Sequence, residues 1–457
     1  MDLESIVTPG LGNSTYLIAS DGEAVVIDPP RDAWRVTAVA AARRWRITHA
    51  LETHVHNDYL SGALELRASD GTEILAPAGG RYAFDHRAMD DGDALEVGSL
   101  RLVARATPGH TPEHLAWDLV DLRSGALSAV ATGGSLMVGS AGRTDLLGSA
   151  ALDELTAAQF HSLRSLAALP DEVAVLPTHG AGSFCGATPV DRGRTSTIGQ
   201  ERALNPLLAI PDATTFRATV MASFTPYPAY YAAMAPMNRA GPALLGRLPR
   251  PPRLDSAGLR AAVAAGARLV DARHRDAVAL GHIPGALAVE LSDSFASYVG
   301  WLLPVGTPLV LVLPDPVDDA ADDAIAQLVR IGFDAIAGIL DGGIDAWQAA
   351  GGTVRSWPTT TGRDLAGADG DGTTTHYLDV RDPHEWAASG TARDALTIPF
   401  WDLPARVGEL PRDAPITVMC KAGGRASVAA SLLEAAGIDV RVVTRGGAPD
   451  LTTLSRG

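Results

Sequence analysis

The chain has 457 residues, of which 46% are apolar and 20% are charged, and its formal net charge is −16. This length predicts about three globular domains, and the negative charge disfavours nucleic acid and anionic membranes as partners, since both need clustered positive charge. No apolar run approaches the length of a membrane span, and the acidic start, MDLESIVTPG, lacks the apolar core of a signal peptide. We therefore expect a cytoplasmic protein without a membrane or nucleic-acid partner.

The first 185 or so residues alternate short β-rich runs with turns and helices. Runs such as STYLIAS, EAVVID and VAVLPTHG predict strands that end in polar residues, and Asp28 and several histidines fall at those ends. Strand ends and their loops collect functional groups in layered α/β folds. The less regular residues 186–245 are expected to pack on this first domain, and the proline-rich stretch 246–255 predicts a linker.

A weak internal repeat occupies the rest of the chain. LVDARHRDAVALGHIPGALAV in one copy matches YLDVRDPHEWAASGTARDALTI in the other, and each copy alternates strand and helix. This pattern predicts a small parallel sheet with helices on both faces in each copy. The Gly/Thr/Asp-rich stretch 359–375 predicts a linker between the copies. We therefore expect domains at 1–245, 252–358 and 370–457.

The second copy contains a cysteine in a setting that suits catalysis. ITVMCKAGGRASV predicts a buried strand, a tight loop and a helix that starts near Arg425, with Cys420 at the strand end. The loop glycines allow backbone N–H groups to point inward. These donors, the helix start and two cations would stabilise a thiolate or the outer sulfur of a cysteine persulfide. The catalytic candidates are Cys420 and Arg425, and the predicted persulfide loop is Lys421, Ala422, Gly423 and Gly424.

The spacing from Cys420 to Arg425 resembles the C-x-x-G-x-R loop of rhodanese sulfurtransferases, whereas tyrosine phosphatases use C-x5-R. LDVRDPHEW also resembles the strand that opens the rhodanese fold. The resemblance covers both copies and implies sulfur transfer through a Cys420 persulfide. A gapless alignment from the shared helix puts Asp315 at the cysteine position and Ala320 at the arginine position, so the first copy is expected to be a non-catalytic rhodanese-like domain.

The histidine motifs of the N-terminal part resemble those of the metallo-β-lactamase fold. THVHNDYLSG, TPGHTPEH and LPTHG carry the histidines, and VIDPP with Asp28 matches another landmark of that family. The fold class implied is α/β, with an N-terminal metallo-β-lactamase αββα sandwich followed by two rhodanese-like α/β domains.

Two metal sites are usual in that family, and this chain departs from both. By residue matching, the first site would use His54, His56 and His110, and the second would use Asp58, the residue at 59 and His179. Tyr59 removes one ligand of the second site, and Gly134 stands where a bridging aspartate is normal. We therefore expect at most one metal ion, bound by His54, His56 and His110, with Asp58 as an alternative third ligand to His56. Otherwise Asp58 and His179 would lie behind the ligands or in a second site.

The stretch GRTDL and the fusion to rhodanese repeats resemble persulfide dioxygenases, which hold one Fe(II) through two histidines and a carboxylate. The resemblance implies one Fe(II), with zinc or an empty site as alternatives. It implies a thiol persulfide, thiosulfate or sulfite as partners, and we also expect a homo-oligomer. On this interpretation, Gly134→Asp would restore the carboxylate and raise iron retention.

Two functional alternatives stay open. One is a sulfurtransferase with a silent metallo-β-lactamase-fold scaffold, and the other is a thioester hydrolase of the glyoxalase II kind. Cys185, six residues after His179, either accepts sulfur or is a buried apolar cysteine. The chain has only one further cysteine, Cys420, so both are expected to be free thiols in a reducing compartment.

Overall fold

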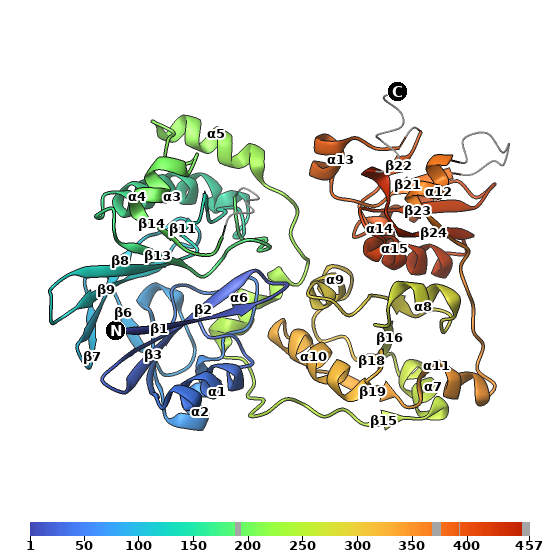
Figure 1. The fold of residues 1–457 in the computed structure, drawn as a ribbon, viewed down its shortest axis with the longest axis horizontal. Coiled ribbons are helices and arrows are strands. Elements are labelled where there is room, and N and C mark those ends of the chain that lie inside the picture. The colour runs from blue at the N-terminus through green and yellow to red at the C-terminus, as the bar shows by residue number, and fades with distance from the viewer. Residues whose placement is uncertain (188–192, 368–375, 393, 450–457) are drawn as a thin grey trace. The chain divides into compact units, whose positions relative to one another are not determined.

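The computed structural model describes residues 1–187, 193–367, 376–392 and 394–449 (Figure 1). Its contacts divide the chain into two compact units, Met1–Pro249 with Leu328–Gly332, and Arg250–Gln327 with Phe333–Gly457. None of the helices in the described ranges combines the length and the apolar character that crossing a bilayer requires.

The first unit is built on two six-stranded sheets. The first sheet has the order β1-β2-β3-β4-β5-β6 and the second has the order β14-β13-β10-β9-β8-β7. The strands of the first sheet are β1 (Asp2–Thr8), β2 (Asn13–Ser20), β3 (Glu23–Ile27), β4 (Arg46–Leu51), β5 (Glu73–Pro77) and β6 (Arg87–Met89). Those of the second are β7 (Ala94–Val97), β8 (Leu100–Ala106), β9 (Leu115–Asp121), β10 (Leu127–Gly133), β13 (Ala174–Pro177) and β14 (Ser196–Thr197), beside a small hairpin of β11 (Leu136–Met137) and β12 (Ser140–Ala141).

Helices cover the outer faces of both sheets (Figure 1). The helical elements of this unit are α1 (Trp34–Arg43), α2 (Ala63–Asp70), η1 (Ala78–Gly80), α3 (Ser149–Ala167), α4 (Ile198–Leu204), α5 (Ala213–Ser223) and α6 (Tyr231–Ala240). Strand alternation explains the layers: in β2, Tyr16 and Ile18 lie in the core between the sheets, whereas Leu17 and Ala19 lie in the core under α1 and α2. The predicted αββα sandwich is confirmed.

The second unit contains two five-stranded parallel sheets with matching strand order, β15-β19-β18-β16-β17 and β20-β24-β23-β21-β22. The first repeat comprises β15 (Arg253–Leu254), α7 (Ser256–Ala264), β16 (Arg268–Asp271), α8 (Arg275–Leu280), β17 (Leu287–Ala288), α9 (Phe295–Leu302), β18 (Leu309–Val312), α10 (Val317–Arg330), β19 (Ile336–Leu340) and α11 (Gly343–Ala349). The second comprises β20 (Thr359–Thr361), α12 (Gly362–Gly367), β21 (His376–Asp379), α13 (Pro383–Ser389), β22 (Leu396–Thr397), α14 (Leu403–Arg406), η2 (Val407–Glu409), β23 (Ile416–Met419), α15 (Gly424–Ala435) and β24 (Val440–Arg445). Tandem rhodanese-like folds are thus confirmed.

The predicted linkers are only partly irregular. Residues 359–367 of the expected 359–375 linker form β20 and α12, and the rest of that stretch lies outside the described residues. Likewise, the stretch 186–245 that was expected to be irregular contains α4, α5 and α6. The Gly/Thr-rich composition of 359–375 predicted too long a linker, because its first threonines form the edge strand β20. Parallel pairing with β24 holds that strand in place.

Strand registers correct the alignment of the two repeats. Asp271 pairs with Val312 in the first repeat, and Asp379 pairs with Met419 in the second. The residues that follow are Leu313 and Cys420, and each helix starts five residues after its strand ends. Leu313 and Asp318 therefore stand at the cysteine and arginine positions. The gapless alignment gave Asp315 and Ala320 because α10 has 14 residues and α15 has 12.

Each repeat keeps the same buried ion pair at the end of a corresponding strand, β16 in the first repeat and β21 in the second. Arg273 donates to Asp271 at 2.9 and 2.6 Å, and Arg381 donates to Asp379 at 2.9 and 2.7 Å. Each arginine also donates to a backbone carbonyl at the end of the next helix, from Gly281 or Gly390. The pair ties strand to helix in both copies, so the shared fold does not depend on the catalytic loop.

Candidate functional site

Strand ends from both sheets bring four histidines into the interior of the first unit. His54 and His56 follow β4, His110 follows β8 and His179 follows β13. We call these four residues the histidine cluster. Their exposed fractions are 0 to 1%, so the surrounding side chains shield the cluster from bulk water.

Hydrogen bonds fix the orientation of His54. The Thr53 hydroxyl donates to Asp28 Oδ2 at 2.7 Å, so its oxygen accepts from His54 Nδ1–H at 2.8 Å. Asp28 also accepts from the Thr53 backbone N–H at 2.8 Å. Nε2 of His54 is left as a lone-pair donor, which is the arrangement that metal-binding histidines use.

His110 is held in the same way by a backbone group. Its Nδ1–H donates to the Arg143 carbonyl at 2.8 Å, and its Nε2 is buried and has no hydrogen-bond partner in the part of the chain that the structure describes. Arg143 is itself fixed by Asp145 at 2.6 and 2.7 Å. These residues belong to the GRTDL stretch, so its role here is to orient His110.

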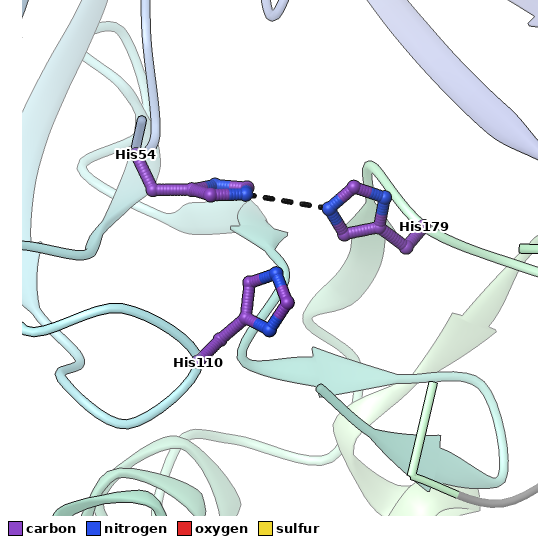
Figure 2. A group of neighbouring side chains, drawn as sticks. All are labelled: His54, His110 and His179. Atoms are coloured by element: carbon purple, nitrogen blue, oxygen red, sulfur yellow. Dashed lines mark hydrogen bonds between the residues drawn. The ribbon is translucent and has the colours of Figure 1, made fainter. Parts of the chain in front are cut away.

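His179 lies against a carboxylate and faces His54. Its Nδ1–H is 3.1 Å from Asn13 Oδ1 and 3.3 Å from Asp58 Oδ2. Its Nε2 lies 3.3 Å from Nε2 of His54, and the His110 ring completes the triangle (Figure 2). Asn13 also donates to Asp58 at 2.7 Å, so the amide locks both groups.

His56 is directed toward acidic groups. Its Nε2 is 3.2 Å from Asp28, 3.1 Å from Glu52 and 3.0 Å from the Tyr59 hydroxyl. Burial by itself would lower the pKa of His56, but the Asp28 and Glu52 carboxylates raise it to about 10. Tyr59 is thus part of a buried hydrogen-bond network, and its hydroxyl also donates to the Asp28 carbonyl at 3.2 Å.

His110, His54 and Asp58 differ from His56 in their charge states. Burial and neighbouring imidazoles lower the pKa of His110 to about 3 and that of His54 well below its ordinary value. Burial alone would raise the pKa of Asp58, but His179 beside it lowers the value to about 2. Neutral imidazoles beside an ionised carboxylate are suitable ligands for a divalent metal.

Among the described residues, three sets of side chains place potential ligand atoms within 4.8 Å of one another. They are His54, His110 and His179; Asp28, His54 and His56; and His56, Asp58 and His179. The expected trio of His54, His56 and His110 is not one of these sets. The structure thus brings together two of its members with a third histidine from the expected second site.

Cys185 is enclosed. Its exposed fraction is 0%, and its Sγ lies 3.8 Å from the Tyr231 hydroxyl. Burial raises the pKa of the Cys185 thiol well above its ordinary value, and the nearby Asp58 charge acts in the same direction. A protonated, enclosed thiol is a poor nucleophile, which favours the interpretation of an apolar core cysteine.

Cys420 directly follows β23 and lies four residues before α15 begins, so it stands at a strand end as the sequence predicts. The Gly423 backbone N–H donates to Cys420 Sγ at 3.0 Å. Gly423 has φ of +100°, and a Cβ there would lie 2.3 Å from the Thr444 carbonyl oxygen, so this position requires glycine. The loop therefore presents backbone donors to a sulfur anion.

Arg425 is paired with Glu385 of α13, a partner that the sequence analysis did not identify. Two guanidinium nitrogens bind its carboxylate, with Nη2 2.9 Å from Oε1. Burial opposes the charge on Arg425, but Glu385 raises its pKa above the ordinary value. This pairing neutralises much of the cation that was expected to contact a substrate.

The first repeat completes the pocket in front of Cys420, which has a volume of about 270 Å³. Arg275 Nε donates to the Thr444 carbonyl at 2.8 Å, and its Nη1 donates to Glu290 at 2.6 Å. Sequence motifs within one repeat could not reveal this contribution. The residues lining this Cys420 pocket are Arg275, Glu290, Ser292, Ser294 and Tyr298 from the first repeat, and Cys420, Lys421, Ala422, Gly424 and Arg425 from the second.

Family models match most of the chain. The model of the metallo-beta-lactamase superfamily matches residues 8–179, and the model of the rhodanese-like domain matches residues 257–350 and 363–448. The chain therefore belongs to the metallo-beta-lactamase superfamily, and it carries tandem rhodanese-like domains.

The N-terminal part of the chain is similar to two kinds of enzyme within that superfamily. The chain is 31% identical over 206 residues to "Persulfide dioxygenase ETHE1, mitochondrial" of Homo sapiens, which covers 43% of this chain and 71% of that protein. It is 32% identical over 185 residues to a hydroxyacylglutathione hydrolase of Cereibacter sphaeroides (strain ATCC 17025 / ATH 2.4.3), covering 39% of this chain and 67% of the hydrolase.

A solved structure matches more of the chain. A metallo-beta-lactamase from Staphylococcus aureus subsp. aureus COL has a TM-score of 0.66 at 28% identity, covering 74% of this chain and 98% of that one. The rhodanese domains and the dioxygenase homology fit an enzyme of sulfur metabolism, and the His/Asp cluster supports a metal site.

Proposed function

We propose that the chain processes sulfane sulfur, with Cys420 as the sulfur-carrying nucleophile and the histidine cluster as the centre of a persulfide-oxidising domain. The observation that carries the proposal is the position of Cys420 Sγ. It accepts a hydrogen bond from the Gly423 N–H at 3.0 Å and faces a pocket lined by Lys421 and by two arginines, Arg275 and Arg425, each of which is paired with a glutamate. An anionic sulfur donor suits that pocket.

The transfer is two displacements at sulfur. The Cys420 thiolate attacks the outer sulfur of thiosulfate, the S–S bond of thiosulfate breaks, and sulfite leaves with the electron pair. The persulfide anion then lies where the Gly423 N–H and the start of α15 stabilise it. An acceptor thiolate attacks that outer sulfur and leaves with it as a new persulfide, and the Cys420 thiolate is restored.

The first unit is proposed to oxidise a low-molecular-weight thiol persulfide. The balanced reaction combines one persulfide, one O2 and one water to give the thiol, one sulfite and two protons. A mononuclear Fe(II), when bound, would supply the redox chemistry that joins O2 to the persulfide sulfur. His54 and His110 would hold it with a further histidine of the cluster, since their Nδ1 atoms are already engaged.

The protein's own part in that reaction is to orient the ligands and to exclude water. Asp28 and Thr53 fix His54, and the Arg143 carbonyl fixes His110. The cluster is at most 1% exposed, so charge that develops there is poorly screened by solvent.

A thioester hydrolase is the second candidate, favoured by the hydroxyacylglutathione hydrolase relatives. That family pattern uses two metals, and Tyr59 stands at one ligand position of the second site. The Tyr59 hydroxyl bonds to His56 and to the Asp28 carbonyl, so it serves the buried network around His56. We therefore place the hydrolase behind the persulfide-oxidising function.

One set of measurements separates the candidates. Metal content, O2 uptake with glutathione persulfide and thiosulfate:cyanide transfer would be measured on the same full-chain preparation. We expect one metal per chain, sulfite formation matched to O2 uptake, and transfer that depends on Cys420. Transfer without O2 uptake would favour the silent scaffold, and two metals with rapid thioester hydrolysis would favour the hydrolase.

A further inference from the structure

The carboxylate that the family pattern puts at position 134 has no room in this chain. A Cβ on Gly134 would lie 2.3 Å from His110 Cδ2, and one on Gly142 would lie 2.9 Å from His110 Cγ. Contacts this short do not occur without movement of the ring. The His110 ring thus occupies the space beside Gly134, and another group must complete the ligand set.

Three imidazole lone pairs meet beside that ring. The Nδ1 atoms of His54, His110 and His179 all donate to oxygen acceptors, so each Nε2 carries a lone pair. Those of His54 and His179 are 3.3 Å apart, and that of His110 is buried without a hydrogen-bond partner among the described residues. The contact between the two Nε2 atoms is a hydrogen bond only if one of them carries a proton, and a metal cation between them can take the place of that proton.

We infer that one divalent metal ion binds through His54, His110 and His179, and that His179 takes the place of the lost carboxylate (Figure 2). The inference deepens the proposed function of the first unit. Tetrahedral coordination with metal–nitrogen bonds of about 2.0–2.1 Å separates neighbouring ligand nitrogens by about 3.4 Å. The 3.3 Å between His54 and His179 matches that spacing.

Asp58 supplies the missing negative charge from behind the ligand. Its Oδ2 lies 3.3 Å from His179 Nδ1 and accepts from Asn13 at 2.7 Å. A carboxylate hydrogen-bonded to the far nitrogen makes an imidazole a more basic ligand. The charge that a bridging aspartate gives directly is thus delivered through His179.

His56 is the competing third ligand, because no described residue forms a hydrogen bond with its buried Nδ1. Its ring is held by three contacts of Nε2 with Asp28, Glu52 and Tyr59. No described set within 4.8 Å joins it to both His54 and His110. The geometry therefore favours His179 over His56 as the third ligand.

The test is a zinc titration of the metal-free full chain with a competing chelator, with His179→Gln and His56→Gln as a matched pair. We expect His179→Gln to weaken Zn²⁺ binding more than 100-fold. Loss of a residue that only hydrogen-bonds to a ligand typically weakens binding by roughly 10–100-fold. Asp58→Asn should fall in that roughly 10–100-fold range, and His56→Gln should weaken binding less than Asp58→Asn does. The opposite order of the two histidine variants would overturn the inference.

A second measurement does not depend on how the variants fold. In crystals of the unmodified chain soaked with zinc, anomalous scattering should place one ion bonded to Nε2 of His54, His110 and His179. An ion bonded to His56 and not to His179 would contradict the assignment, as would two ions. Stoichiometric metal at this place without O2 uptake would contradict the proposed oxidation but would still support the ligand assignment.

Gly134→Asp separates this ligand set from the family pattern. The sequence pattern alone predicts tighter metal binding by this variant. The position of the His110 ring predicts weaker zinc binding, because the new side chain displaces a ligand. Tighter zinc binding by the variant would contradict the inference.

Discussion

The two rhodanese-like repeats share a fold but differ in the four-residue loop that joins the central strand to the next helix, 313–316 in the first repeat and 420–423 in the second. Both have the same strand order and the same buried Asp–Arg pair. Cys420 in one corresponds to Leu313 in the other, and Gly423 corresponds to Pro316. Proline has no N–H, so the first repeat lacks both the nucleophile and the donor that binds it. On the proposed function, the loop and not the fold would therefore determine which repeat transfers sulfur.

The first repeat also contributes residues to the Cys420 pocket. Arg275 and Tyr298 of the first repeat line the Cys420 pocket. Other contacts join the two repeats: His282 Nε2 lies 2.9 Å from Glu434, and the Trp301 and Trp401 rings stack with centroids 4.4 Å apart. A repeat that has no cysteine in its loop can therefore still contribute residues to the pocket of its neighbour.

The largest effect should come from Cys420→Ser. Removing a catalytic nucleophile costs at least about 10³-fold in rate, and serine is too weak a nucleophile to replace the thiolate. Thiosulfate:cyanide transfer should become undetectable, with an unchanged circular dichroism spectrum. Cys185→Ser is the matched control, and it should retain transfer because that thiol is enclosed. The reverse result would refute the role of Cys420.

Removal of the aspartate from the buried ion pair should lower the free energy of unfolding more in the second repeat than in the first. Asp379→Ala leaves Arg381, whose side chain is 1% exposed, without its counter-charge. Such a loss destabilises by about 3–5 kcal/mol. Asp271→Ala should cost less, because the Arg273 side chain keeps 15% exposure to water. Urea denaturation of the full chain measures both free energies of unfolding, and an equal or reversed order would show that the exposure of the arginine does not set the loss of stability.

Arg275→Gln should weaken the binding of the sulfur donor. Losing a charge-assisted contact costs about 1.5–3 kcal/mol, so the KM for thiosulfate should rise about tenfold or more. The KM for cyanide should change little, because cyanide reacts after the dianion has left. Arg275→Lys, which keeps the charge, should recover part of the loss. If kcat falls and the KM for thiosulfate stays constant, Arg275 is structural.

The smallest effect is expected from rebuilding the first loop. Leu313→Cys in a Cys420→Ser background should give no measurable transfer. Pro316 cannot donate to the new sulfur, and Asp318 puts a negative charge where Arg425 stands in the other copy. Transfer above the Cys420→Ser background would show that the loop donors are dispensable.

Much of this arrangement could be predicted from the sequence. The resemblance of the histidine motifs to the metallo-β-lactamase fold predicted the sandwich. The alternation of strands and helices predicted both repeats, because local patterns determine those elements. The position of Cys420 at a strand end followed from the same pattern. The alignment of the first repeat was wrong by two residues, since α10 is longer than α15. A gapless comparison cannot detect a difference in helix length.

The side-chain partners could not be predicted, because they depend on distant segments meeting. Glu385 reaches Arg425 across 40 residues, and Arg275 reaches the Thr444 carbonyl across 169. His179 lies 3.3 Å from His54 although 125 residues separate them. Residue matching put His56 with His54 and His110, and it carried no information about the carboxylates of Asp28 and Glu52 around that ring.

The most direct test of the central claim is peptide mass spectrometry of the full chain after incubation with thiosulfate and removal of the excess. The account predicts that the peptide with Cys420 gains the mass of one sulfur atom, that cyanide removes it, and that the peptide with Cys185 is unchanged. Added sulfur on Cys185 alone, or on neither peptide, would contradict the account.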